Sequence, residues 1–247
     1  MDLDPIVRFS ARVEDYIHYR PSYPAGLLTV LESECGLTPH SRIADIGSGT
    51  GLLSELFLGF GCEIFGIEPN PDMRSAGERL LAGWPRFHSI DGRAEATTLP
   101  ASSVDLITAA QSFHWFEVDG ARSEFRRILK PEGWAVLVWN ERLPGPCFMA
   151  GYEDLVRRFG PERPRVDEDR LSRFFGHGDW KLTLLSNQQR FDLEGLRGRF
   201  LSSSYAPVRG TRDSAALIEE IDRLFRQYQS NGLVTLLYET RVYTGKL

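Results

Sequence analysis

Between Arg42 and Asn140, short apolar runs alternate with amphipathic stretches, which is the pattern of strands followed by helices. Five apolar runs predict strands, namely Arg42–Ile46, Cys62–Glu68, Phe87–Ile90, Val104–Ala110 and Trp134–Trp139. Apolar residues recur at helical spacing from Leu52, which predicts a first helix. A second helix is expected to begin at Pro71, with Asn70 as its cap, and a third is expected over residues 120–129. Because the strands are apolar along their length, they predict a parallel sheet with helices on both faces.

The flanking segments have a different pattern. Residues 1–40 predict two helices, around Arg12–Arg20 and Ala25–Cys35. After Asn140 we expect a helix from Phe148, a strand over Trp180–Phe191, a long amphipathic helix and a closing strand over Val234–Tyr243. The core stripe of the long helix comprises Leu217, Ile218, Ile221, Leu224, Phe225 and Tyr228. We expect one α/β domain over 1–247, with N-terminal helices in 1–40, a core in 41–141, and in 142–247 a helical cap plus the last strands of a seven-stranded, mostly parallel sheet.

Composition narrows the functional classes. The chain has 247 residues, of which 42% are hydrophobic and 26% charged, and its net charge of −5 gives no general attraction to nucleic acid. No apolar run approaches the roughly 18 residues of a membrane helix, and the first residues do not resemble a secretory signal. We therefore expect a cytoplasmic protein that binds neither nucleic acid nor membrane. The widely spaced Cys35, Cys62 and Cys147 predict no disulfide framework and no zinc site, and we expect Cys62 and Cys147 to be buried.

A glycine-rich segment, DIGSGTG (45–51), lies between the first predicted strand and its helix. Glycine allows a tight turn and a close approach of the backbone to a ligand, and the helix N-terminus adds unpaired N–H groups with a partial positive charge. Ligands of open α/β sheets bind beyond the carboxyl ends of the strands, which is where this segment falls. By itself the segment suits any nucleotide-like ligand, or it is only a tight turn.

Two details favour one ligand class. The spacing is GxGxG and not the GxGxxG of dinucleotide-binding folds, and no Gly-Lys-Ser/Thr follows as in a phosphate loop. Glu68 ends the second strand, where a carboxylate accepts hydrogen bonds from both hydroxyls of a ribose. Glu68 alone does not separate S-adenosylmethionine (SAM) from NAD, but together with Asp45 and the glycine spacing it favours SAM.

Five segments together resemble the class I SAM-dependent methyltransferases. They are DIGSGTG (45–51), IEPN (67–70), DGRAEATTLP (91–100), VDLITAAQSFHWF (104–116) and LKPEGWAVLVWNE (129–141). The sequence is most similar to the branch of trans-aconitate methyltransferase and related small-molecule enzymes, also in Phe9–Pro24, in residues 203–207 and in the closing strand. Glu132 departs from the family, which usually has a second glycine there. The resemblance implies a Rossmann-like class I fold.

The resemblance also implies a set of cofactor contacts. The residues concerned are Tyr16, Tyr19, Arg20, Asp45, Gly47, Gly49, Gly51, Glu68, Pro69, Met73, Ala94, Glu95 and Gln111. The glycine backbone would hold the methionine part of SAM with Asp45 fixing the loop, and Gln111 would lie near the same part. Arg20 would pair with the SAM carboxylate, as suits a guanidinium fork. The alternative for Arg20 is a cap on the first helix.

The remaining contacts belong to the nucleoside end. Glu68 would bind the ribose, Pro69 and Met73 would pack near the adenine, and Ala94 and Glu95 would face the adenine from the loop after the third strand. Met73 has the alternative of filling the core, and Glu95 that of a solvated loop acid. Tyr16 and Tyr19, with Tyr205 and Trp115, would shape an apolar pocket around the sulfonium.

Methyl transfer from SAM needs no metal and no covalent intermediate, and the sequence contains no HExxH, Cys/His cluster or GxSxG motif. A carboxylate acceptor needs no base, whereas a hydroxyl, amine or carbon acceptor can need one. His114 is the candidate base, with the alternative that His114 and Trp115 form a packed corner. Arg199 and Arg209 are candidates to pair with an acidic acceptor.

Two other functions stay open on the sequence. One is an NAD-dependent oxidoreductase, against which the glycine spacing counts. The other is a catalytically silent SAM-binding protein. A nucleic-acid methyltransferase is disfavoured because Gln111-Ser112-Phe113-His114 stands where an NPPY-type tetrapeptide would follow the fourth strand. We expect a SAM-dependent methyltransferase with a small-molecule acceptor, producing S-adenosylhomocysteine (SAH). The acceptor and the oligomeric state are not encoded in any pattern we recognise.

Overall fold

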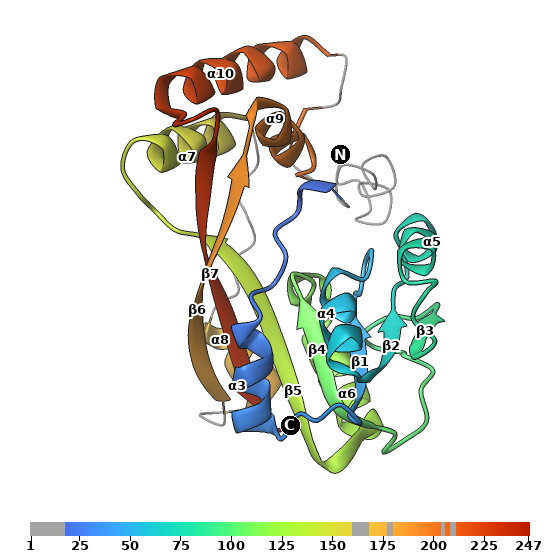
Figure 1. The fold of residues 1–247 in the computed structure, drawn as a ribbon. Helices are drawn as coiled ribbons and strands as arrows, with labels where there is room; N and C mark the ends of the chain where they lie inside the picture. Colours follow the sequence, from blue (N-terminus) through green and yellow to red (C-terminus); the bar gives the residue numbers. More distant parts are fainter. Residues whose placement is uncertain (1–17, 160–167, 177–179, 204–205, 208–210) are drawn as a thin grey trace. The chain divides into compact units, whose positions relative to one another are not determined.

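The computed structural model of this chain describes residues 18–159, 168–176, 180–203, 206–207 and 211–247. Its seven strands form one sheet in the order β3-β2-β1-β4-β5-β7-β6 (Figure 1). Strand β1 pairs in parallel with β2 and β4, β2 with β3, and β4 with β5. The predicted seven-stranded, mostly parallel, Rossmann-like sheet is confirmed.

The strands lie close to where the apolar runs predict them. They are β1 (Arg42–Ile46), β2 (Glu63–Ile67), β3 (Phe87–Ile90), β4 (Val104–Ala110), β5 (Leu129–Arg142), β6 (Trp180–Phe191) and β7 (Val234–Gly245). The prediction for β5 was wrong at its start, since the strand begins at Leu129 and not at Trp134. Residues 131–133 are thus part of the strand, and its register with β4 shifts between Val104 and Leu106.

The helices of the described chain are α3 (Gly26–Cys35), α4 (Leu52–Phe60), α5 (Pro71–Leu80), α6 (Val118–Ile128), α7 (Phe148–Phe159), α8 (Glu168–Phe175), α9 (Leu193–Leu201) and α10 (Arg212–Tyr228), with a short 3-10 turn η1 (Phe113–Trp115). The cap on α5 is confirmed: the Asn70 side chain accepts hydrogen bonds from the amides of Asp72 and Met73. Helices α8 and α9 were not predicted. The predicted helix around Arg12–Arg20 lies largely outside the described residues.

The chain forms two compact units. The core unit comprises Ser22–Asn140, Pro164–Leu185 and Thr240–Leu247, and the cap unit comprises Met1–Pro21, Glu141–Arg163 and Ser186–Glu239. Strands β5, β6 and β7 contribute residues to both. The prediction of one domain over 1–247, divided at 41 and 142, stays a prediction.

The core unit has a hydrophobic cluster on each face of its sheet. Ala44, Ile46 and Ile107 belong to the cluster that contains Phe125 of α6 and Phe174 of α8. Alternate strand residues, Ile43, Ile64 and Leu106, belong to the cluster with Leu27 of α3 and Phe57 of α4. Two covered faces explain why the strands are continuously apolar.

The cap unit has its own cluster, in which α7 and α10 pack together with α9. Leu217, Ile221, Leu224 and Phe225 are buried, which confirms most of the predicted stripe of α10. The predicted burial of Cys62 is confirmed, but that of Cys147 is wrong, because Cys147 is exposed.

Candidate active site

Asp45 is the buried anchor of the glycine loop. Only 1% of its surface is exposed, and its two carboxylate oxygens accept hydrogen bonds from the hydroxyls of Ser54 on α4, at 2.7 Å, and Thr108 on β4, at 3.0 Å. Burial raises the pKa of Asp45 to about 6, although these two hydrogen bonds oppose the shift. The side chain therefore ties the end of β1 to the helix that follows and to the neighbouring strand.

The three glycines of the loop have conformations that other residues rarely adopt. Gly47, Gly49 and Gly51 have φ values of 68°, 58° and 85°. A Cβ at Gly47 would lie 2.6 Å from the Cβ of Ser112, and one at Gly51 would lie 2.4 Å from a methyl carbon of Leu81. The glycines at 47 and 51 are therefore required by packing as well as by backbone angle.

The loop is also held against β2. The amides of Gly47 and Ser48 both donate to the carbonyl of Ile67, at 2.8 and 3.2 Å. From the other side, the hydroxyl of Ser112 donates to the carbonyl of Ile46 at 2.7 Å. Ser112 was missed by sequence reasoning, since nothing in the local pattern links it to a carbonyl 66 residues away.

Glu68 sits where β2 ends and turns toward α5. Its carboxylate is buried, with 8% of the residue exposed, and accepts hydrogen bonds from the amide of Gly49 at 2.9 Å and of Asn70 at 2.8 Å. Burial raises the pKa of Glu68, and the two amide hydrogen bonds oppose that rise. Because each carboxylate oxygen has two lone pairs, each can accept one further hydrogen bond, for example from a ribose hydroxyl.

The residues predicted around the adenine lie in the same unit. Met73 is buried on α5, and its terminal carbon would be 3.3 Å from a Cβ at Gly49, so it packs against the glycine loop. Pro69 is half-buried between Glu68 and the α5 cap, and Ala94 is buried. Their contact with an adenine stays a prediction.

Glu95 has a structural partner that the sequence did not indicate. Its carboxylate accepts a hydrogen bond from the amide of Glu117 at 2.8 Å, just where α6 begins. The Glu117 side chain in turn caps α6 by accepting from the amides of Asp119 and Gly120. Glu95 thus connects the loop after β3 to the start of α6, and its role toward the adenine stays a prediction.

The segment after β4 contains Gln111 and His114. Gln111 has a φ of 56°, and its side-chain amide donates to the carbonyl of Asn140 at 3.2 Å, which fixes the turn out of the strand. The Nδ1 atom of His114 is buried and has no hydrogen-bond partner among the described residues. Its ring centroid lies 4.6 Å from that of Trp115, which is 44% exposed.

The surroundings of His114 keep its imidazole neutral. Burial, with a smaller contribution from the positive charge of Arg170, lowers the pKa of His114 to about 4. Arg170, on the unpredicted α8, also donates to the carbonyls of Phe113 and Phe116, at 3.3 and 2.9 Å. An imidazole of such low basicity is a weak proton acceptor at neutral pH.

Tyr19 and Arg20 belong to the cap unit. The ring of Tyr19 lies against Gly198 of α9, where a Cβ would be 2.1 Å from a ring carbon, and the guanidinium of Arg20 donates to the carbonyl of Ser202 at 3.1 Å. Arg199 is buried and donates to the hydroxyls of Tyr238 and Ser203. Tyr16, Tyr205 and Arg209 lie outside the described residues. The ligand contacts predicted for this group stay predictions.

Two features are absent from the described part of the chain. No group of three or more His, Cys, Asp or Glu side chains is placed to hold a metal ion within the described ranges. Among the same residues, no helix is long and apolar enough to cross a membrane.

Comparison with known proteins agrees with the fold and the loop. Residues 44–137 match the family described as "Methyltransferase domain". An uncharacterized methyltransferase-like protein of Schizosaccharomyces pombe is 28% identical over 245 residues, covering 96% of this chain and 94% of its own.

Solved structures share the architecture. A candidate type II methyltransferase from Anaeromyxobacter dehalogenans superposes with a TM-score of 0.74 at 22% identity, over 92% of this chain and 98% of its own. A geranyl diphosphate methyltransferase solved in complex with SAM has a TM-score of 0.53 at 14% identity, over 100% of this chain and 93% of its own. At these identities the structural likeness concerns the fold. The chain has the Rossmann-like class I fold, and the sequence matches together with the glycine loop indicate a SAM-dependent methyltransferase.

Proposed function

We propose that this enzyme methylates a small molecule and that the accepting atom is a carboxylate oxygen, as in the trans-aconitate methyltransferase-like branch that the sequence resembles. The observation that carries the proposal is the environment of His114, the one candidate base that the sequence offers. Its pKa of about 4 leaves it neutral at physiological pH. An imidazole with so low a pKa is a weak base, so it has little tendency to take a proton from a hydroxyl or an amine. A carboxylate is already ionised and needs no such help.

The residues of the core unit fit the cofactor. The backbone of the 45–51 loop, kept free of Cβ atoms at its three glycines, would receive the methionine part. Glu68 would bind the ribose through the lone pairs that Gly49 and Asn70 leave unused. When bound, SAM supplies a methyl group already activated by a sulfonium. The chain then has to hold the acceptor in line with that methyl group and to exclude water.

Arg199 is the candidate residue of the cap unit for recognising an acidic acceptor. Arg199 is a buried guanidinium hydrogen-bonded to two hydroxyls, and its planar fork suits a carboxylate. We propose it as the residue that recognises the acid. Arg199→Lys keeps the charge and loses the fork, so it should raise the KM for an acid substrate more than it lowers kcat.

The test is methyl transfer from radiolabelled SAM to matched small molecules. Each pair consists of a carboxylic acid and the corresponding primary alcohol or amine. The proposal predicts base-labile methyl esters from acids and no product from the matched partners. His114→Ala should keep kcat within about threefold of the wild type, because a general base would contribute about 10²–10⁴-fold. If the enzyme methylates an alcohol or an amine and His114→Ala greatly lowers kcat, the proposal is contradicted and His114 is the general base.

A further inference from the structure

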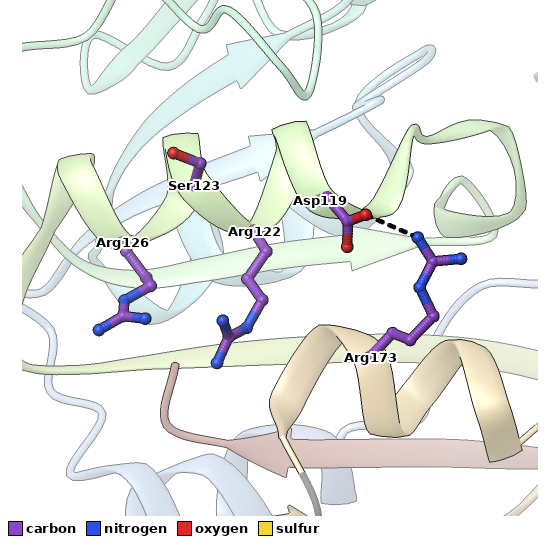
Figure 2. A pocket seen from close by; sticks show the side chains of 5 residues that line it. All are labelled: Asp119, Arg122, Ser123, Arg126 and Arg173. Atoms are coloured by element: carbon purple, nitrogen blue, oxygen red, sulfur yellow. Dashed lines mark hydrogen bonds and ion pairs between the residues drawn. The ribbon is translucent and has the colours of Figure 1, made fainter.

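Helices α6 and α8 of the core unit form a positively charged groove. Its lining consists of Asp119, Arg122, Ser123, Arg126 and Arg173, around an empty volume of about 660 Å³ that is partly open to solvent. Figure 2 shows Arg122 and Arg126 extending from the same side of α6, while Arg173 reaches from α8 to Asp119. None of these residues belongs to the predicted cofactor or acceptor site.

The charges of the groove do not balance. Three guanidiniums face one carboxylate, and that carboxylate is already held by Arg173, with 2.7 Å between the Nη2 and Oδ2 atoms. Neither Arg122 nor Arg126 makes an ion pair with any residue that the structure describes. The pair is spaced four residues apart on α6, a spacing at which like charges repel.

The other acids of α6 do not compensate them. Glu124 is bound by Arg127 and by the hydroxyl and amide of Thr97. Glu117, which precedes the helix, is used in its cap. The positive charge of the groove is therefore not neutralised by its own helix.

One arginine is held in position. The Nε atom of Arg122 donates to the carbonyl of Phe174 at 2.7 Å, which anchors a half-buried side chain. The two Nη atoms of a guanidinium carry four further N–H donors. Arg126 is exposed at the edge of the same groove. An anchored guanidinium next to an exposed one suits an anion with several acceptor oxygens, because each guanidinium can donate two parallel hydrogen bonds.

We propose that this groove is a binding site for a phosphate-bearing small molecule, independent of the methyltransferase site. A phosphate group has three terminal oxygens and up to two negative charges, which matches the charge left uncompensated at Arg122 and Arg126. A single carboxylate would be satisfied by one guanidinium fork and would leave the second arginine without a partner.

The experiment is calorimetric titration of the full chain with pyrophosphate, in the absence of SAM and at low ionic strength. The proposal predicts saturable binding that weakens several-fold when chloride raises the ionic strength from about 20 to about 150 mM. Acetate, which has a single carboxylate, should bind at least about tenfold more weakly. Absence of saturable pyrophosphate binding, or equal affinity for acetate, would overturn the proposal.

Two variants locate the site. Arg126→Gln should weaken pyrophosphate binding about tenfold, the equivalent of one charge-assisted hydrogen bond. Its matched control is Arg226→Gln, which removes an exposed arginine of α10 that also lacks an ion pair to any described residue. Asp119→Asn should tighten binding several-fold, because it removes the one acid of the lining and releases Arg173. If Arg126→Gln and Arg226→Gln have equal effects, or Asp119→Asn weakens binding, the groove is not the site.

Discussion

Glu68→Gln changes one buried carboxylate oxygen into an amide nitrogen while keeping the shape of the side chain. In the wild type the two oxygens accept the amides of Gly49 and Asn70, at 2.9 and 2.8 Å. A main-chain N–H cannot accept a hydrogen bond, so in the variant one donor faces another. A buried donor without a partner costs about 1–3 kcal/mol. Removing the burial penalty of the carboxylate offsets part of this, and we expect the free energy of unfolding to fall by about 1–2 kcal/mol.

Asp45→Asn is the matched control for this substitution. Asp45 is also a buried carboxylate with two hydrogen bonds, but its partners are the hydroxyls of Ser54 and Thr108. A hydroxyl donates or accepts as required, so both hydrogen bonds survive in the amide. At neutral pH this variant should lose no stability, and it should bind SAH like the wild type.

Urea unfolding and calorimetric titration with SAH measure both effects on the same samples. Besides the loss of stability, Glu68→Gln should weaken SAH binding about tenfold or more, since the ribose hydroxyls lose an ionised acceptor. Wild-type stability together with wild-type affinity in a folded Glu68→Gln protein would refute both the hydrogen-bond argument and the ribose assignment.

Three further predictions concern Asp45, Gly51 and Arg20. The pKa of Asp45 is raised from 3.8 to about 6, so the wild type should lose about 2 kcal/mol of stability relative to Asp45→Asn as pH rises from about 4 to about 7. Urea titrations that give a pH-independent difference would be inconsistent with this. Gly51→Ala should lower the free energy of unfolding by about 2–4 kcal/mol, because Gly51 has a φ of 85° and a Cβ there would clash with Leu81. The control Gly59→Ala should be neutral or stabilising in thermal unfolding, because no atom lies within 4 Å of a Cβ at Gly59. Arg20→Ala should weaken SAH binding with little change in melting temperature. A large fall in melting temperature with unchanged SAH affinity would instead indicate that Arg20 caps the first helix.

The fold was predictable where the physical cause is local. Strands β3, β4 and β6 have the predicted bounds, because uninterrupted apolar or alternating runs end at polar or turn residues. The cap of α5 was predictable from Asn70 and Pro71 for the same reason. Helix α9 was not, since Gly195 and Gly198 interrupt its short sequence and lower its helix propensity.

Other features depend on contacts between distant residues. The start of β5 at Leu129 was not predictable from the sequence, because Pro131 and Glu132 are typical of a turn. The strand continues through these residues because it pairs with β4. The bond from Ser112 to Ile46 and the pairing of Glu95 with the start of α6 join segments that no periodicity connects. The low pKa of His114 likewise arises from burial and from Arg170, 56 positions further along the chain on a helix that was not predicted.

We propose that the loop at 45–51 and Glu68 bind SAM. The most direct measurement is calorimetric titration of the purified wild-type chain with SAH, with NAD titrated as the control. We expect an affinity for SAH on the order of micromolar and no detectable heat of binding with NAD. Binding of NAD, or no binding of SAH by a folded protein, would contradict it.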